Sequence, residues 1–565
     1  MPPTEQRRRR VGIAAAIAAI AVALAGCTGI PTSGPVVEGP EVGLAEPDFV
    51  VNPAGPQEDA SPREILAGFM SAVRAPQGGY LVAREFLTAD LAQQWRPDAA
   101  ALVRTGTPEY VEGLVTNELA TVDYLVETIG EVDDRGRYRE TLPTTRTISY
   151  SFALVDGQWR ISEAPDGVIL SQAGFDSAFT ETPLFFLDPT SRYLVPDVRW
   201  FADRSTSARR AVEQLLIGPT DWLQRVIVSS FPVGTTVGPQ GVEIRSGVAM
   251  VDLSAEASSA TPEARSAMRA QLAQTLGVAD LQISAAGVPL EVPSGIPSPV
   301  VDPQPSGTVL VGTGGAFGFG TVEGDAPGIV EIAGISSAIV ADGATGATLA
   351  HDQTSAAYLG ADGAVRYVAI GDPTPVVLDD RDGLVVPSLD PFGFVWTARA
   401  GVADAGISAI PLEGAPIPLV PDGLPGELSV VSIDVSRDGT RLLVAASSVL
   451  GPRVLVFGIA RTDGIPTQLT GPVELVAPGG TIVDAAWVDD RSVVVIGGST
   501  GVRAVHLPLS GPREELGLVA DAVSIAGGRN GVSGIRALAD GQVLAASSGG
   551  WSDTDIVATF LGIQQ

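Results

Sequence analysis

The chain has 565 residues but only one cysteine, two histidines and no lysine, so every basic residue is arginine. One cysteine cannot form an internal disulfide or a CxxC redox or zinc motif. Zincins need an HExxH pair and P-loop nucleotide sites need a lysine, so the composition excludes both chemistries. The histidines, His351 and His506, lie far apart in the chain. His506 stands inside an apolar run, where we expect a packed, hydrogen-bonded ring rather than a catalytic group.

Cations are few relative to acids, and the net charge is -30 at pH 7. Nucleic-acid phosphates would be repelled, which excludes a nucleic-acid partner. Hydrophobic residues make up 45% of the chain, enough for packed cores in three or four domains. Glycine and proline are frequent, at 66 and 43 residues, and favour turns and short strands over long helices.

Long apolar runs are scarce, and the longest uncharged one, Val11–Gly26, lies near the N-terminus behind Arg7–Arg10. Arginines before an apolar run resist translocation, so this end is expected to stay on the cytoplasmic side. The run is short for a membrane span, which needs about 20 residues. It ends in small residues before the single cysteine and resembles the lipobox of bacterial lipoproteins: Leu24, Ala25, Gly26 and Cys27.

This resemblance implies that residues 1–26 are a signal peptide, cut before Cys27. The Cys27 sulfur would carry diacylglycerol, and the new amino terminus an acyl group such as palmitate. Two or three acyl chains hold a protein on a bilayer stably, because each buried methylene contributes about 0.8 kcal/mol. The expected location is therefore the extracytoplasmic face of the cell membrane. An ordinary secretory signal and an uncleaved anchor are the alternatives.

Residues 27–60 carry the cysteine and a stretch rich in proline, glycine and acids, typical of a flexible spacer. Order is predicted to begin at Ser61, because Pro62 and Glu64 complete a helix-start signature with it. Strand-like runs follow and close in a hairpin that turns at Asp156-Gly157.

This order of elements over residues 61–175 resembles the nuclear-transport-factor-2-like (NTF2-like) α+β fold, a cone that can hold a small ligand. The segment contains no histidine and no cysteine. Trp95 and Trp159 are expected in the core rather than in a ligand-stacking site.

Residues 183–291 are predicted to form a second α+β domain. Several spaced stretches resemble the GerMN domain, which is thought to contact proteins or cell wall: LFFLDP, AVEQLLIGP, FPVGT, GVAMVDLS and QLAQTL. We expect Arg204, Arg209 and Arg210 to form a solvated helix face, with a partner contact as the alternative. Residues 292–307 are rich in proline and are predicted to be a linker.

Residues 308–565 repeat weakly, with an aspartate, often followed by glycine, between apolar strands roughly every 50 residues. A period of this length fits the four-stranded blade of a β-propeller, so we predict an all-β propeller of five or six blades whose DG turns each join two strands. The repeated aspartates are Asp342, Asp390, Asp438, Asp489, Asp490 and Asp540.

One acidic turn, Asp379–Gly383, resembles part of a calcium loop but lacks the glutamate that should follow. We interpret it as a solvated turn and expect no metal site.

The whole order of segments resembles the lipoprotein LpqB family of high-GC Gram-positive bacteria. The most specific stretches are SPREILAGFMSAVRAP, AREFLT, LVPDVRWF and AVEQLLIGP. The resemblance implies a non-enzymatic accessory protein without cofactor or catalytic residues. Its partners would be the bilayer, through acylated Cys27, and the extracellular domain of the sensor kinase MtrB of the MtrAB two-component system, in cell-envelope homeostasis and division.

Two other functions stay open. The first is binding of a cell-wall polymer or a small envelope ligand, through the N-terminal cone or the propeller channel. The second is a propeller hydrolase with acids in the channel, which residue spacing cannot reveal.

Overall fold

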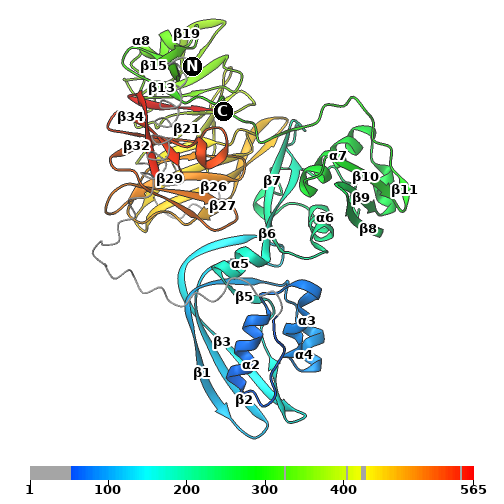
Figure 1. Ribbon diagram of the computed structural model, residues 1–565. Helices are drawn as coiled ribbons and strands as arrows, with labels where there is room; N and C mark the ends of the chain where they lie inside the picture. Colours follow the sequence, from blue (N-terminus) through cyan, green and yellow to red (C-terminus); the bar gives the residue numbers. More distant parts are fainter. Residues whose placement is uncertain (1–52, 324–325, 402–404, 422–427, 548–549) are drawn as a thin grey trace, which may run out of the picture. The chain divides into compact units, whose positions relative to one another are not determined.

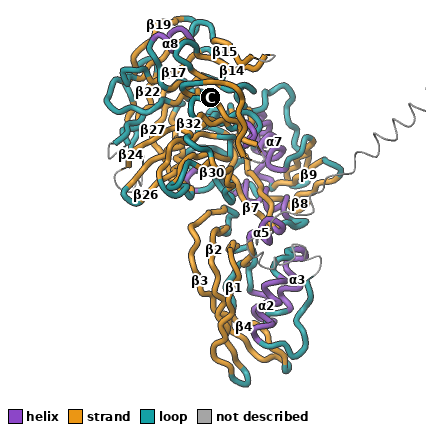
Figure 2. The backbone as a smooth tube through the Cα atoms, turned by 60° about the vertical axis from the view of Figure 1, so that its left-hand side comes forward, coloured by secondary structure: helices purple, strands orange, loops and turns teal. Residues whose placement is uncertain are grey.

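The computed structural model describes residues 53–323, 326–401, 405–421, 428–547 and 550–565. The predicted signal peptide, lipobox and Cys27, with the spacer as far as residue 52, lie outside these ranges. The multidomain prediction is confirmed: two α+β segments precede a β-rich C-terminal segment (Figures 1 and 2). None of the described helices is both long and apolar enough to cross a bilayer.

The N-terminal domain places three helices against a curved five-stranded sheet of order β4-β3-β2-β1-β5 (Figure 1). The helices are α2 (Pro62–Ala72), α3 (Gln77–Glu85) and α4 (Ala89–Gln94). The strands are β1 (Ala101–Val115), β2 (Leu119–Val132), β3 (Tyr138–Val155), β4 (Gln158–Glu163) and β5 (Val168–Ser171).

Local signals in the sequence position helix α2 as predicted. The Ser61 hydroxyl accepts the Glu64 N–H, and the Glu64 carboxylate accepts the Ser61 N–H at 2.8 Å, which completes a capping box. The apolar face of α2 then packs on the sheet. Trp95 is 2% exposed and packs against Phe69 with ring centroids 5.4 Å apart, so its predicted core position is confirmed. Trp159 is only partly buried at the edge of this core.

The predicted hairpin at Asp156-Gly157 joins β3 to β4. We expected this hairpin to be the last element of the domain, and this expectation is wrong. The chain continues into β5, which pairs in parallel with β1 at the opposite edge of the sheet. Strand β5 consists of three apolar residues and a serine, too few for a periodic signal.

The second α+β segment contains two small sheets and two helices around one apolar core. After helix α5 (Gln172–Ala178) come β6 (Phe179–Leu187), β7 (Tyr193–Ala202), α6 (Ser207–Ile217), β8 (Val237–Arg245), β9 (Val248–Leu253), α7 (Pro262–Leu276), β10 (Asp280–Ala285) and β11 (Val288–Pro289). The Thr261 hydroxyl caps α7, and Gly218 ends α6. Strands β10 and β11 form a hairpin rather than one continuous strand, because Ala286 and Gly287 between them adopt positive φ.

The expected solvated arginine face is wrong at two of its three positions. Arg204 forms an ion pair with Asp98 of the N-terminal domain, and Arg210 reaches the same carboxylate at 3.0 Å. Only Arg209 lies half exposed, paired with Glu213 at 2.7 Å within α6. The proline-rich segment 292–307, predicted to be a linker, also contributes a strand, because β12 (Val300–Val301) pairs in parallel with β7.

The C-terminal segment builds six four-stranded blades within the described residues, together with one short helix, α8 (Ser336–Ala341). The last strand, β36 (Phe560–Gln564), joins the first two blades into one eight-stranded sheet, and the other four blades are separate sheets. The first blade comprises β36, β13 (Leu310–Gly312), β14 (Phe317–Glu323) and β15 (Ala326–Glu331). The second comprises β16 (Gly346–Leu349), β17 (Ser355–Leu359), β18 (Val365–Ala369) and β19 (Asp372–Asp379). The third comprises β20 (Ser388–Leu389), β21 (Phe394–Thr397), β22 (Ser408–Pro411) and β23 (Ile417–Pro418).

Three further blades complete the segment. The fourth comprises β24 (Leu428–Val435), β25 (Arg441–Ser448), β26 (Gly451–Thr462) and β27 (Ile465–Leu475). The fifth comprises β28 (Thr481–Trp487), β29 (Ser492–Gly498), β30 (Arg503–Pro508) and β31 (Glu514–Leu518). The sixth comprises β32 (Ala522–Ala526), β33 (Arg536–Ala539), β34 (Gln542–Ser547) and β35 (Gly550–Val557).

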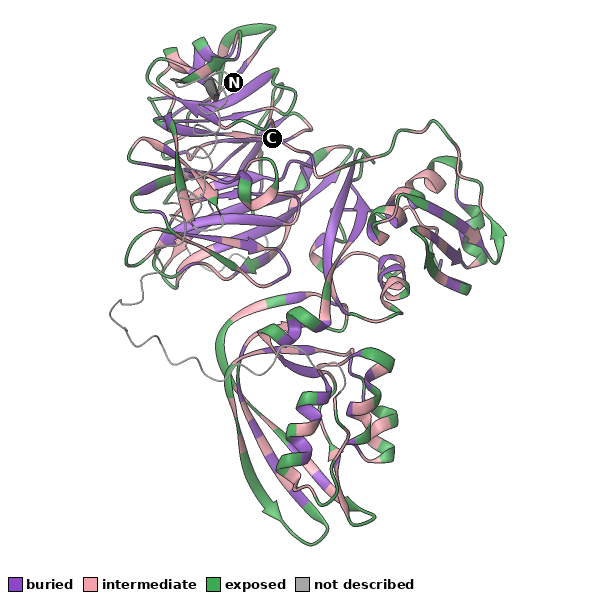
Figure 3. Ribbon diagram, in the orientation of Figure 1, coloured by how far each residue is buried: buried purple, intermediate pink, exposed green. Residues whose placement is uncertain are grey.

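These sheets close into a six-bladed propeller. The C-terminal strand β36 pairs with β13, so the two ends of the segment share one blade. Separate apolar clusters fill the space between each pair of neighbouring blades, including the last and the first. The buried residues concentrate in these strands (Figure 3). Such closure hides the sheet edges from solvent.

The aspartate repeat marks the blades only in the middle of the propeller. Asp390, Asp438 and the Asp489-Asp490 pair lie between the first and second strands of three consecutive blades. Asp342 instead follows α8, and Asp540 lies between β33 and β34, the second and third strands of the sixth blade. The prediction that each DG turn joins two strands is therefore confirmed at Asp438 and Asp540 and wrong at Asp342, where the turn joins a helix to a strand.

The centre of the propeller contains a buried carboxyl group, Asp434. It accepts hydrogen bonds from the Trp487 N–H at 3.0 Å and from Ser388 and Gln565 at 3.2 Å each. Burial nevertheless raises the pKa of Asp434 to about 6. Between about pH 4 and pH 6 the unfolded chain is then ionised while the folded chain keeps its proton, so this group lowers stability as pH rises through that window.

We expect the free energy of propeller unfolding to fall by about 3 kcal/mol between pH 4 and pH 7 in the wild type relative to Asp434→Asn, because only the wild type titrates there. Urea unfolding at several pH values measures this difference. The exposed substitution Asp380→Asn serves as the control and should follow the wild type. Parallel profiles for wild type and Asp434→Asn would contradict the assignment.

Candidate functional site: a cavity in the N-terminal domain

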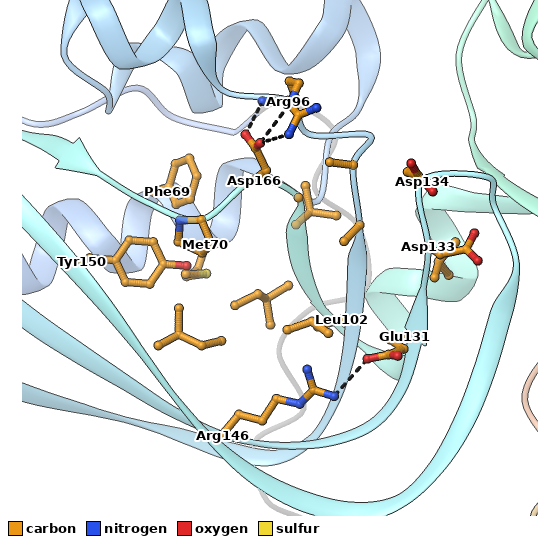
Figure 4. Close-up of a pocket in the computed structure, with 18 of the residues that line it drawn as sticks. Phe69, Met70, Arg96, Leu102, Glu131, Asp133, Asp134, Arg146, Tyr150 and Asp166 are labelled. Atoms are coloured by element: carbon orange, nitrogen blue, oxygen red, sulfur yellow. Dashed lines mark hydrogen bonds and ion pairs between the residues drawn. The ribbon is translucent and has the colours of Figure 1, made fainter.

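The candidate site is a cavity of about 890 Å³ in the N-terminal domain, which we call the cone cavity. Its lining residues come from α2, the loop after α4, strands β1, β2, β3 and β5, and the loop before β5. The volume falls in the range of about 300–1,000 Å³ that is typical of small-molecule sites. Figure 4 shows the side chains that surround it.

One part of the wall is apolar. Phe69 and Met70 come from α2, Leu102 from β1, and Ile148 and Tyr150 from β3. Phe69 and Tyr150 meet edge to face, with ring centroids 6.4 Å apart. This wall offers an apolar body a dry surface to pack against, which is the main source of binding energy in such sites.

Tyr150 also brings a polar atom to this wall. The residue is 2% exposed, and Figure 4 shows its hydroxyl directed toward Met70 and the interior of the cavity. Burial raises the pKa of Tyr150, so the hydroxyl keeps its proton at neutral pH. It forms no hydrogen bond with another of the residues that the structure describes.

The first of two ion pairs in the lining joins Arg96 to Asp166. The Asp166 carboxylate accepts the Arg96 backbone N–H and Nε–H, both at 2.9 Å, and Nη2–H at 2.6 Å. The backbone hydrogen bond and then the guanidinium hold the pKa of Asp166 below its ordinary value. Three bonds to one carboxylate lock the loop before β5 onto the end of the helical layer.

The second ion pair joins Glu131 of β2 to Arg146 of β3, with Oε2 and Nη2 2.9 Å apart. Glu131 also pairs with Arg139. Burial raises the pKa of Glu131, but the hydrogen bonds from the two arginines outweigh burial and leave it lowered. Figure 4 shows this pair and the Arg96–Asp166 pair on different sides of the apolar wall.

Two further acids, Asp133 and Asp134, lie on the turn after β2 (Figure 4). Both are exposed to solvent. Asp133 accepts the backbone N–H groups of Arg135 at 3.0 Å and Arg137 at 2.9 Å, so it shapes the turn. Their charges are therefore screened by water at the rim rather than held inside the cavity.

The arrangement is suited to binding rather than to proton transfer. A general acid at neutral pH needs a raised pKa, whereas those of Glu131 and Asp166 are lowered. Each of these carboxylates is also occupied by an arginine. The Tyr150 hydroxyl is a hydrogen-bond donor that keeps its proton. The cone cavity thus combines an apolar wall, one donor and two neutralised ion pairs.

The other residues considered from the sequence form no site with the cavity. His506 packs in β30 as predicted, but it is not fully satisfied, because no described residue bonds its buried Nε2. Its Nδ1 lies 3.7 Å from Glu514, and burial lowers its pKa. His351 Nδ1 lies 3.1 Å from the Gln565 carbonyl.

The Asp379–Gly383 turn is built on an ion pair. Asp379 pairs with Arg381 at 2.7 Å and accepts the Thr397 hydroxyl at 2.8 Å, so its oxygens are occupied. Across the described residues, no group of three or more His, Cys, Asp or Glu side chains is arranged to hold a metal ion.

One short stretch, Gly497–Gly501, has the GxSxG spacing of an esterase nucleophile elbow. An elbow joins a strand to a helix, whereas Ser499 lies exposed in the turn between strands β29 and β30. The structural context of the motif is therefore absent at this serine.

Sequence reasoning did not find the polar residues of the cavity: Arg96, Glu131, Arg146, Tyr150 and Asp166. The partners of each ion pair lie 70 and 15 positions apart in the chain. Cross-strand pairing along the β2–β3 hairpin would have indicated Arg139 as the partner of Glu131 and not Arg146, because the register places Arg139 directly opposite. Nothing local marks Asp166 as the partner of Arg96.

Family models match the chain in three segments. The N-terminal domain model of lipoprotein LpqB matches residues 55–176, and the LpqB β-propeller model matches residues 321–559. Between them, a model described as sporulation and spore germination matches residues 183–291. The fold and these segments define a multidomain lipoprotein with a GerMN-like domain between an N-terminal domain and a propeller.

The chain belongs to the lipoprotein LpqB family. It is 28% identical to lipoprotein LpqB of Streptomyces coelicolor over 88% of this chain and 87% of that protein. The corresponding protein of Bifidobacterium longum is 28% identical over 80% of each chain. The protein of Cutibacterium acnes is 32% identical over 49% of this chain, a match that spans about half (47%) of that relative.

Among solved structures, the tandem GerMN domains of the sporulation protein GerM from Bacillus subtilis are similar to 22% of this chain and 45% of that chain. The identity is 23% and the TM-score is 0.18.

Proposed function

We propose that this protein is a non-enzymatic lipoprotein, anchored through acylated Cys27 on the extracytoplasmic face of the cell membrane, that modulates a two-component sensor kinase of the MtrB type. The observation that carries the proposal is the match of both LpqB-specific models, one to each end of the folded chain. The lipobox precedes them in the sequence. The membrane, the kinase and the envelope role are what the family resemblance implies.

Physical reasoning supports an accessory role. An acyl anchor confines the folded domains to a thin layer beside the membrane, where the outer domain of a sensor kinase is also held. Such confinement raises the effective concentration of two partners and makes a weak contact productive without a large interface. The GerMN-like domain and the propeller offer the contact surfaces.

We expect the full chain, purified from detergent-solubilised membranes, to retain the sensor kinase of the MtrB type. An unrelated sensor kinase from the same membranes should not be retained, which controls for nonspecific capture. Quantitative mass spectrometry of the retained proteins measures both. The same low recovery for the two kinases, at high concentrations of the full chain, would contradict the proposal.

The cone cavity favours a second function, binding of a small envelope ligand. Its volume, its apolar wall and the Tyr150 hydroxyl support this function. The two functions are compatible, because a ligand-dependent accessory protein would report the state of the envelope to its kinase.

A further inference from the structure

The charged side chains that line the cone cavity lie on its solvent-exposed side and form ion pairs: the Arg96 side chain is 74% exposed and the Arg146 side chain 39%. Arg96 is bound by Asp166 through three hydrogen bonds, and Arg146 is bound by Glu131. The apolar wall around Tyr150 carries no charged side chain, so a charged ligand group placed against it would give up water without meeting a counter-charge there. Because both pairs are partly exposed to solvent and already matched in charge, they attract an entering charge only weakly.

The remaining interior groups select for an uncharged molecule. The wall of Phe69, Met70, Leu102 and Ile148 rewards an apolar body, since burial contributes about 25 cal/mol per Å² of apolar surface. Tyr150 supplies a hydrogen-bond donor that is nine-tenths or more buried and directed inward (Figure 4). An acceptor oxygen on the ligand would satisfy it.

We propose that the cone cavity binds an uncharged, largely apolar molecule that carries one hydrogen-bonding oxygen, and that it discriminates against anionic and cationic molecules of the same shape. This proposal rests on the second proposed function and specifies its ligand class. It is independent of the kinase role.

Three probes with one ring system and different charge test the ligand class: 2-naphthalenemethanol, 2-naphthoate and 2-naphthylmethylammonium. Their binding to the full chain in lipid nanodiscs is measured by calorimetry at neutral pH, with empty nanodiscs as the blank. We expect the alcohol to bind at least about tenfold more tightly than either ion, because only the ions lose hydration without a counter-charge.

Two variants locate the binding. Leu102→Trp adds bulk inside the cavity and should abolish binding of the alcohol. Leu142→Trp makes the same class of change on β3, where the residue is 67% exposed and outside the lining, and should leave binding unchanged. Tyr150→Phe removes only the hydroxyl and should weaken binding about fivefold.

The outcomes distinguish two questions: whether the cavity binds a ligand at all, and whether that ligand is uncharged. If either ion binds as tightly as the alcohol, and Leu102→Trp abolishes that binding, the cavity is a ligand site but the uncharged class is wrong. If no probe binds, or if binding survives Leu102→Trp, the cavity is not a ligand site and the second proposed function fails with it.

Discussion

The substitution Cys27→Ser is expected to move most of the protein from the membrane fraction into the soluble fraction. A serine hydroxyl cannot form the thioether that the lipobox directs to Cys27, and it is the only cysteine in the chain. Each acyl methylene that leaves the bilayer costs about 0.8 kcal/mol, so the loss of two chains changes the partition by many orders of magnitude. Membrane flotation followed by quantitative immunoblotting measures the distribution.

The neighbouring substitution Thr28→Ser keeps the sulfur and should stay with the membrane, which controls for effects of mutation near the cleavage site. The apolar run Val11–Gly26 is short for a span, so it should not replace the lipid if cleavage fails. Full membrane retention of Cys27→Ser would favour the uncleaved anchor over the lipoprotein.

The second large effect is expected in the propeller, where Asp438→Ala should destabilise the fold by about 3–5 kcal/mol. Asp438 and Arg441 form a buried ion pair, with side chains 2% and 0% exposed. The same carboxylate accepts the Ser436 hydroxyl at 2.6 Å and the Thr440 N–H at 2.9 Å. The alanine leaves the guanidinium charged and without its carboxylate in the interior, and this accounts for most of the cost.

Hydrogen exchange under increasing urea measures the change locally, in peptides of β24 and β25, while peptides of the N-terminal domain serve as an internal reference. Asp380→Ala removes an exposed aspartate and should shift stability by no more than about 0.5 kcal/mol. The double variant Asp438→Ala/Arg441→Met removes both charges and should be more stable than Asp438→Ala alone. An Asp438→Ala variant as stable as the wild type would show that this pair does not hold the blade.

Elements with local signals could be predicted from the sequence. The capping residue Ser61 and the glycine turn at Asp156-Gly157 lie where the sequence pattern predicted them. These signals act over three or four residues, so one sequence suffices to read them. The same holds for the α+β and propeller classes, which follow from periodicity and resemblance.

Elements that depend on distant parts of the chain could not be predicted. Strand β5 exists because β1 offers a free edge, and β12 because β7 does. We predicted that Arg204 and Arg210 face solvent, but both contact Asp98, which lies more than a hundred positions away in the chain. The cone cavity has the same origin, since its lining draws on separate segments between Phe69 and Ile169 that only the fold brings together.

The Cys27 anchor is tested most directly by mass spectrometry of the amino-terminal peptide of the protein isolated from its native membrane. We predict a peptide that begins at position 27 and carries the added mass of a diacylglycerol thioether, with or without an amide-linked acyl group. A peptide that contains an unmodified sulfur, or that still continues into residues 1–26, would contradict the anchor on which the proposed function depends.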